Sequence, residues 1–337
     1  MRKALLLTVS LALLLCSACH RRDHANVPPA HRGIYHWKTR YNPSPWELQW
    51  LHDHKVDKLY IKLFDVEPGS RAGHPDWKMV PTATTTFAQH LPTDMEVVPV
   101  VYITVDAIRA LEYDRNNDYT DLYARLIVKR IDEMMAEHYG DTIREVQLDC
   151  DWTQQTQSGY FALAKAIKGL LHKRGITLSG TLRLHQLHLV EELRVSKYEW
   201  MEPDTIPFDR KLLMCYNTGR LQDIATHNSI LDFDNVEPYL KQYHLPTLYG
   251  TDVAWPVFGW ALEFDSEGHF RRIINSHQIP DTTLPNLREE WGEHDAIRRT
   301  GRALPRLDNN HTTILFHLDS LNLSKYSHED IEAFYAL

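Results

Sequence analysis

Two aspartates, Asp149 and Asp151, are the residues of this chain most clearly placed to do chemistry. They lie in the run 145–151, where apolar and polar residues alternate, so a strand would point both carboxylates to one side. Like charges this close are costly unless a hydrogen bond, a cation or a shared proton relieves them, which is typical of a polar site. The alternative is structural, with one Asp capping the next helix and the other meeting an arginine.

Acids, amides and aromatic rings also gather at the ends of the other predicted strands. Pyranose rings have apolar faces that stack on Trp or Tyr and hydroxyls that need fixed donors and acceptors, so this mixture suits a sugar. A chain with nine Trp and sixteen Tyr will also place some of them there by chance. The candidate ligand-binding residues are Tyr35, Trp37, Tyr102, Trp152, Arg183, His185, Met214, Asn217, Asp252, Trp255 and Asp319.

Two of these strand ends resemble those of family 18 glycoside hydrolases. The run 148–152 (LDCDW) resembles the Asp-x-Asp-x-Glu end of that family's fourth strand, and 214–217 (MCYN) resembles the Met-x-Tyr-Asp/Asn end of its sixth. The resemblance implies a barrel that acts on a glycan at the carboxyl ends of its strands. It also implies catalytic roles, in which Asp151 orients the substrate's N-acetyl group, Asp149 supports Asp151, and Tyr216 holds the substrate.

The position of that family's proton-donating glutamate is occupied here by Thr153. A threonine hydroxyl is far too weak an acid to protonate a glycosidic oxygen. Either another acid replaces it, with Asp252, Asp319 and Glu263 as candidates, or the protein binds a glycan without cleaving it. A further carboxyl group within about 5 to 10 Å of the aspartate pair would favour hydrolysis, and its absence would favour binding.

A metal-dependent barrel hydrolase is the third alternative. His185 and His188, together with His36, His317 and Asp319, could gather as ligands at the barrel mouth. The paired His-x-His that such hydrolases carry on their first strand is absent, and unclustered histidines are more often capping or surface groups. We therefore expect no metal and no cofactor.

Strand-like runs alternate with helix-like ones along the chain, which indicates parallel strands covered by helices. Their number matches an α/β fold of the (β/α)8 TIM barrel type. The predicted strands are Gly33–Trp37, Lys58–Asp65, Glu96–Thr104, Glu145–Asp151, Thr177–Leu184, Lys211–Tyr216, Thr247–Asp252 and Thr312–His317.

Helix signals lie between these strands. Residues 44–47 (SPWE) form a capping box with proline at the first helical position, and 327–330 (SHED) caps the last helix. Apolar residues recur at helical spacing in 123–134 and 160–171, and a short helix is predicted at 235–242.

Residues 33–337 are predicted to form one barrel domain with two additions. The segment 67–95 is long, polar and contains proline, and 255–311 is an insertion at the barrel rim. Within the insertion, 260–264 and 269–273 flank a turn and predict a hairpin. Long loops at this face are where barrels build binding sites.

Residues 1–18 have the pattern of a secretory signal, two basic residues before an apolar run too short to span a bilayer. Cys19 resembles the lipidated first residue of a bacterial lipoprotein, although Cys16 stands where Leu is usual and an ordinary signal is the alternative. We predict a flexible tether at 19–32 and a lipid anchor in the cell envelope, with His20 favouring the outer membrane.

The chain has 337 residues, 43% apolar composition and a net charge of −8, and removing the two positive charges of residues 1–18 gives −8 − 2 = −10. An acidic chain with no basic run argues against nucleic acid as a partner. Cys150 and Cys215 lie in apolar strand patterns and are predicted to be unpaired on the helix side. Alternation places Arg183 on the polar side of its strand, and we expect it to point inward and keep both aspartates ionised.

Overall fold

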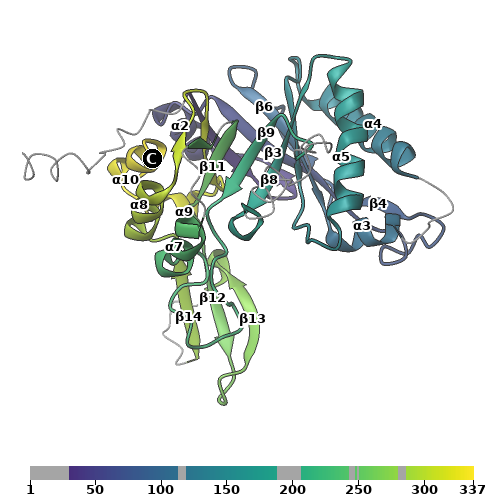
Figure 1. The fold of residues 1–337 in the computed structure, drawn as a ribbon. Helices are drawn as coiled ribbons and strands as arrows, with labels where there is room; N and C mark the ends of the chain where they lie inside the picture. The colour runs from purple at the N-terminus through teal and green to yellow at the C-terminus, as the bar shows by residue number, and fades with distance from the viewer. Residues whose placement is uncertain (1–29, 113–118, 188–205, 243–246, 249, 280–285) are drawn as a thin grey trace, which may run out of the picture.

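The computed structural model describes residues 30–112, 119–187, 206–242, 247–248, 250–279 and 286–337. Within them, eight parallel strands close into a barrel, because β1 pairs with both β16 and β3 (Figure 1). The predicted (β/α)8 barrel is confirmed. In barrel order the strands are β1 (His31–His36), β3 (Lys58–Pro68), β6 (Glu96–Ile103), β7 (Glu145–Asp149), β8 (Thr177–Arg183), β9 (Arg210–Met214), β11 (Thr251–Pro256) and β16 (Thr312–Phe316).

Helices cover the outside of this barrel (Figure 1). The capping boxes predicted at Ser44 and Ser327 are both formed, each with reciprocal hydrogen bonds between the cap residue and the third helical residue. The helices are α2 (Pro45–Asp53), α3 (Val105–Glu112), α4 (Thr120–His138), α5 (Gln157–His172), α7 (Phe233–Gln242), α8 (His294–Ala303), α9 (Ser320–Leu323) and α10 (His328–Tyr335), with short 3-10 turns η2 (Leu184–Gln186) and η3 (Ser276–Gln278).

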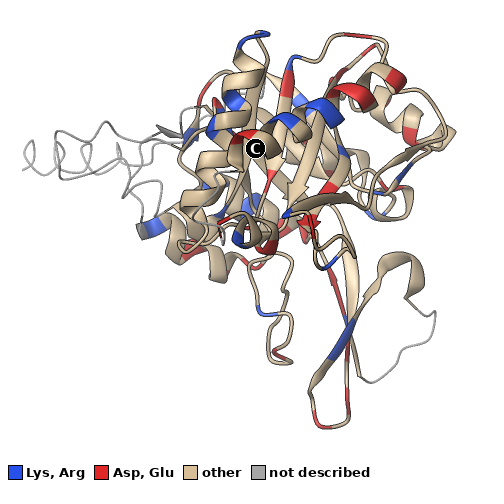
Figure 2. Ribbon diagram, turned by 90° about the vertical axis from the view of Figure 1, so that its right-hand side faces the viewer, with Lys and Arg blue, Asp and Glu red and all other residues tan. Residues whose placement is uncertain are grey.

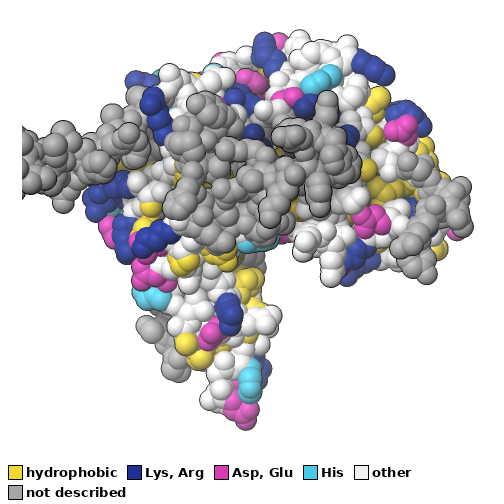
Figure 3. Space-filling view, viewed as in Figure 1, with side chains coloured by type: hydrophobic (Ala, Val, Ile, Leu, Met, Phe, Trp, Pro, Cys, Tyr) yellow, Lys and Arg dark blue, Asp and Glu magenta, His cyan; other side chains and the backbone are white. Residues whose placement is uncertain are grey.

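Besides the barrel, the described residues form three further strand pairs and one three-stranded sheet. The predicted hairpin is confirmed as part of a three-stranded antiparallel sheet that projects away from the barrel (Figures 1 and 2). Hydrophobic side chains are visible along this projection in Figure 3. The strands are β2 (Arg40–Tyr41) with β5 (Thr86–Phe87), β4 (Met79–Thr82) with the end of β3, β10 (Thr247–Leu248) with β15 (Arg306–Leu307), and β12 (Gly259–Phe264) between β13 (Phe270–Asn275) and β14 (Leu287–Trp291).

The seventh barrel strand lies later in the chain than predicted. Residues 247 and 248 form β10, which pairs with β15, and Gly250 then turns the chain with φ +57. The barrel strand β11 begins at Thr251 and continues to Pro256, so the insertion starts at 257 and not at 255. Pro256 can end this strand because proline is tolerated where ladder hydrogen bonds are no longer needed.

The first strand begins earlier than predicted. His31 and Arg32 pair with Thr312 and Thr313 of β16, so the end of the predicted tether at residue 32 is wrong by two residues. Cys19 and the rest of the predicted signal and tether lie outside the described residues. Among the described helices, none is long and apolar enough to cross a bilayer.

Both cysteines of the barrel are free and buried, as predicted. Cys150 follows β7 and Cys215 follows β9, and β8 separates these two strands. Burial raises the pKa of each thiol, so both stay neutral and pack as small apolar groups. Basic and acidic residues are interspersed over the ribbon (Figure 2).

Candidate functional site

The outermost part of the site is an ion pair between Asp151, just after β7, and Arg183, at the end of β8. The guanidinium Nε donates to Oδ1 of Asp151, and Nη2 donates to Oδ2 at 2.6 Å. Although burial lowers the pKa of Arg183, the hydrogen bonds and charge of Asp151 raise it above its ordinary value. The two side chains keep 34% and 25% of their surface exposed, so a ligand can reach this pair. The inward Arg183 that alternation predicted is confirmed.

Asp149 lies deeper in the barrel than Asp151 and is buried. Its Oδ1 accepts a hydrogen bond of 2.5 Å from the hydroxyl of Thr181. Burial, and then the neighbouring charge of Asp151, raise the pKa of Asp149 to about 7. The expectation of two ionised aspartates is therefore wrong, because Arg183 forms its bidentate pair with Asp151 and leaves Asp149 to take up a proton near neutral pH.

Aromatic rings stand beside this pair, and we call them the aromatic rim. Trp37 lies 5.4 Å from Phe316 and 6.3 Å from Tyr102, measured between ring centroids. Phe316 lies 5.4 Å from Tyr216, which extends the contacts across the barrel. Tyr102 pairs in register with Asp149 on the neighbouring strand, and burial, followed by the charges of the two aspartates, raises the pKa of Tyr102. The rim consists of Trp37, Tyr102, Tyr216, Phe258, Trp260 and Phe316.

Three members of the rim were missed by the sequence analysis. Phe316 carried a signal, because it alternates with Thr312 and Ile314 on one face of β16. Phe258 and Trp260 carried none, since they belong to the insertion and reach the rim only through its fold, with ring centroids 5.3 Å apart.

Lys62 and Asp65 also belong to the site, although neither was predicted. Strict alternation would place residues 62 and 65 on opposite faces of β3, but the pairing register with β6 shifts between Lys62 and Phe64. This bulge lets the Lys62 Nζ approach Asp65 Oδ1 to 2.9 Å and lie 5.6 Å from the centre of the Trp37 ring. Asp65 pairs in register with Tyr102, and Tyr102 with Asp149, so the two acids lie at one level of the barrel.

Two predicted tryptophans lie on the helix side and not in the site. Trp152 is fully buried and packs on α5, 5.1 Å from the Phe161 ring and 6.5 Å from the Tyr160 ring. Trp255 is also fully buried, and it alternates along β11 with Asp252, which faces the barrel interior. Both indoles fill the layer between strands and helices, so the prediction that they bind ligand is wrong.

Asp252 lies at the amino end of the barrel, opposite the site. It accepts hydrogen bonds from Arg210 Nη2 at 2.5 Å, from Arg210 Nε at 3.0 Å and from the backbone N–H of Thr312 at 2.6 Å. The prediction that Asp252 ends its strand is wrong, because β11 begins one residue before it. It can neither bind a ligand at the mouth nor replace the missing acid.

The other two acids proposed as proton donors are also committed elsewhere. Asp319 caps α9 and contacts Lys38 Nζ at 2.8 Å and His277 Nε2 at 2.6 Å. Although burial raises the pKa of Asp319, its hydrogen bonds to Lys38 and His277 lower it to about 2. Glu263 lies on the projecting sheet, where it accepts a hydrogen bond of 2.5 Å from Arg272.

The remaining predicted residues occupy varied positions. Tyr35 is buried and donates a hydrogen bond to Gln147, and Met214 is buried at the end of β9. Asn217 is exposed with a positive φ of 57, and His185 is exposed in η2. The prediction that these four residues contact a ligand remains untested.

Thr153 lies in an exposed turn after Asp151. Its N–H donates to the hydroxyl of Thr156 at 3.0 Å, which shapes the start of α5. Of the histidines considered as ligands, His36 is buried and His317 is half-buried. Removal from water lowers their pKa values to about 3 and about 4. His188 lies outside the described residues. Among the described residues, His36, His185, His317 and Asp319 are not found grouped as metal ligands.

Comparison with known proteins identifies the fold. No protein-family model matches this chain, and no curated protein matches it in sequence. The C-terminal domain of a putative chitinase from Desulfitobacterium hafniense DCB-2 has a similar structure, with a TM-score of 0.54, 8% identity, and coverage of 90% of this chain and 99% of that one. A class V chitinase from Pseudomonas fluorescens Pf-5 gives a TM-score of 0.50, 10% identity, and coverage of 91% and 99%. The fold of this chain is therefore similar to the fold of these two proteins.

The barrel carries at its carboxyl end a solvent-accessible ion pair, a buried acid and a rim of aromatic rings. The ion pair offers fixed donors and acceptors, and the rings offer apolar edges and faces. The buried acid can hold a proton near neutral pH, but it lies beneath the ion pair with 8% of its surface exposed. This arrangement is suited to holding a polar ligand that also has apolar faces.

Proposed function

We propose that this protein binds a glycan at the carboxyl end of its barrel and does not cleave it by the route of family 18 enzymes. The observation that carries the proposal is the bidentate pair between Arg183 and Asp151. The resemblance assigns Asp151 to orienting the substrate's N-acetyl group, but here both of its oxygens already accept hydrogen bonds from a guanidinium.

The aromatic rim supports a sugar as the ligand. Trp37, Tyr102 and Trp260 are each partly exposed, so a pyranose face can stack on them. Arg183 uses two of its five N–H donors on Asp151, so further donors can reach hydroxyl groups. The chitinases with the same fold support this choice of ligand class by analogy, since their names describe enzymes that act on chitin.

The absence of a committed proton donor supports binding over hydrolysis. Thr153 stands where the resemblance expects the glutamate. Asp252 lies at the amino end of the barrel, Glu263 lies on the projecting sheet, and Asp319 is held by Lys38 and His277. Asp149 can carry a proton, but Asp151 and Arg183 lie between it and solvent.

Hydrolysis with a different acid is the second candidate, and Asp65 is the observation that favours it. Asp65 and Asp149 lie in register on strands separated by β6, and neighbouring strands are about 4.8 Å apart. Their backbones are therefore about 10 Å apart, at the upper end of the separation that catalytic carboxyl pairs use. The ion pair of Asp65 with Lys62 opposes this role, because Lys62 Nζ already contacts the carboxylate oxygen Oδ1 at 2.9 Å.

The experiment that tests the proposal is a glycan panel, including oligomers of N-acetylglucosamine, assayed for binding and for release of reducing ends. We expect binding without release for the unaltered chain, and loss of binding for Asp151→Asn. Asp132→Asn is the matched control, which should keep binding, because Asp132 lies on α4 outside the barrel and pairs with Arg174. Release of reducing ends that Asp65→Asn abolishes would instead establish the hydrolase.

We also propose that the protein is attached to the bacterial cell envelope through lipid on Cys19, with the outer membrane as its site. The support is the sequence pattern of residues 1–19, since these lie outside the described residues. Metabolic labelling with a radioactive fatty acid should label the unaltered chain and leave Cys19→Ser unlabelled and soluble. Labelling of the variant would contradict the anchor.

A further inference from the structure

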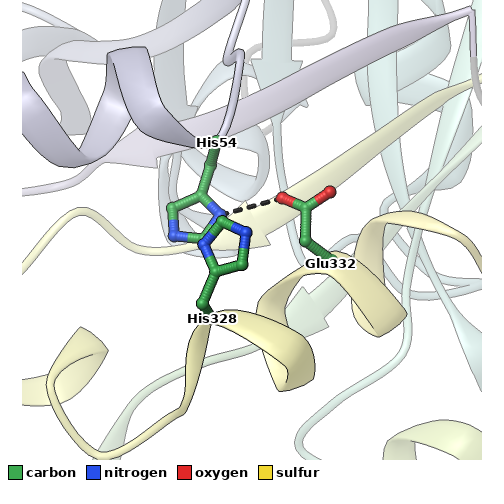
Figure 4. A group of neighbouring side chains, drawn as sticks. All are labelled: His54, His328 and Glu332. Atoms are coloured by element: carbon green, nitrogen blue, oxygen red, sulfur yellow. Dashed lines mark hydrogen bonds and ion pairs between the residues drawn. The ribbon is translucent and has the colours of Figure 1, made fainter.

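Two histidines and a glutamate meet where the first and last helices of the barrel approach each other (Figure 4). His54 follows the end of α2, His328 begins α10, and Glu332 lies one helical turn further along α10. Each offers one ligand atom, and these atoms lie within 4.8 Å of one another. In the part of the chain that the structure describes, this is the one group of three such residues found.

The three side chains are already oriented toward one another. Nδ1 of His54 lies 2.9 Å from Oε1 of Glu332, and the rings of His54 and His328 stack with centroids 4.6 Å apart. His328 and Glu332 are four residues apart, which places them on the same face of the helix. His54 is held in place by burial, with 5% of its side chain exposed, and its ring also packs 4.4 Å from that of Trp50.

We propose that His54, His328 and Glu332 bind one divalent transition-metal ion, with zinc as the representative ion, and that this ion ties α2 to α10. Two imidazoles and one carboxylate are a donor set that zinc accepts, with water completing a tetrahedron. His54 and Glu332 are 278 residues apart in the sequence, so the ion would join two distant parts of the chain. A site of this kind fastens the end of the chain to its first helix.

Only a small movement is needed to close the site. Ligand atoms around tetrahedral zinc are about 3.4 Å apart, given zinc distances of about 2.1 Å. The His54 and Glu332 atoms at 2.9 Å need to separate slightly, and His328 needs to approach. His328 is exposed, so its ring can rotate toward the ion without disturbing the core.

Arg32 is a neighbouring group whose charge opposes a cation. Its Nη1 donates to Oε1 and Oε2 of Glu332, at 3.0 and 2.9 Å, and to the backbone oxygen of His54 at 2.9 Å. A carboxylate has about four lone-pair sites, so Glu332 can accept these bonds and still bind a metal. Hydrogen bonds of this kind orient metal-ligating carboxylates, but the positive charge weakens cation binding, so we expect micromolar affinity.

Binding also requires the ligands to lose protons. His54 shares a proton with Glu332 through Nδ1, and this proton must move to Nε2 or leave before Nδ1 can bind a metal. Affinity should therefore fall in acid, because protons compete with the metal for the imidazole nitrogens.

The test is titration of the metal-free full chain with ZnCl2 by calorimetry, and with Co²⁺ followed by visible absorption. His328→Ala is the informative variant, because an exposed residue can be removed without loss of folding. His172→Ala is the matched control, because His172 is likewise a partly exposed histidine at a helix terminus. It lies 2.8 Å from the carboxylate of Asp209 but belongs to no group of three ligands among the described residues. Circular dichroism of both variants checks that they are folded.

We expect the unaltered chain and His172→Ala to bind one equivalent of zinc with micromolar affinity and to give a tetrahedral cobalt spectrum. His328→Ala should bind zinc at least 10-fold more weakly and should not give the tetrahedral cobalt spectrum. Zinc should raise the Tm of the unaltered chain and of His172→Ala, but not the Tm of His328→Ala. Equal binding by His328→Ala and the unaltered chain, or no binding by the unaltered chain, would overturn the proposal.

Discussion

Both ends of this barrel contain buried acids beside basic groups, yet they differ in what can reach them. At the amino end, Lys58 Nζ lies 3.2 Å from Glu145, and Arg210 lies 2.5 Å from Asp252. The two acids there expose 4% and 3% of their side chains. The pair at the carboxyl end exposes a quarter to a third of its surface and has the aromatic rim beside it.

A cluster of charged residues therefore does not by itself indicate a ligand-binding site. The amino-end acids are closed off by partners in the barrel interior, beside a small polar cavity of about 140 Å³. Each acid is neutralised by its basic partner at the amino ends of the strands. In barrels, residues at this end usually contribute to stability. Exposure, nearby rings and a position at the strand ends are what distinguish the carboxyl-end pair.

The largest effect is expected from breaking the amino-end network. Arg210→Met should leave Asp252 buried without its ion partner and reduce the free energy of unfolding by about 3 to 5 kcal/mol. Urea denaturation measures this change. Glycan affinity of the protein that remains folded should be unchanged, and a specific loss of binding would show that the amino end contributes to the ligand site.

The reverse pattern is expected at the carboxyl end. Asp151→Asn should weaken glycan binding more than 10-fold, because it removes the charge that fixes Arg183. Stability should change by about 1 kcal/mol or less, as for other partly exposed ion pairs. Denaturation and binding assays on the same preparation decide this: a large loss of stability with binding retained would make the aspartate pair structural.

Dependence on pH should also distinguish the two acids of the mouth. The pKa of Asp149 is raised from 3.8 to about 7, so the folded state binds more protons than the unfolded state between these values. Stability from this group is therefore present below about pH 4 and is lost as the pH rises toward 7. Asp149→Asn should remove this dependence of the free energy of unfolding on pH, measured between pH 4 and 8. Asp151→Asn should lower the pKa of Asp149, because it removes a neighbouring negative charge.

The smallest effect is expected from single rings. Trp37→Leu should weaken glycan binding by about 2- to 10-fold, the equivalent of about 0.5 to 1.5 kcal/mol for one aromatic contact. Trp152→Phe is the matched variant on the helix side, and it should reduce stability while leaving affinity unchanged. If both variants bind alike, the aromatic rim is not part of the ligand site.

Much of the fold could be predicted because its signals are local. The alternating run at 145–151 placed both aspartates inside the barrel, and the two capping boxes formed as expected. The site was harder to predict, since a bulge at residue 63 brings Lys62 and Asp65 together against the alternation rule. The seventh strand was misplaced because its polar beginning resembled a strand end.

Along regular strands such as β7, the sequence by itself determined which side chains face the barrel interior, because that depends on a period of two. The tertiary structure decided which acid Arg183 would meet, and so which one keeps a proton. It also decided that His54 would meet Glu332 from the far end of the chain. These contacts depend on how separate strands and helices pack against one another, and no local pattern of residues specifies that packing.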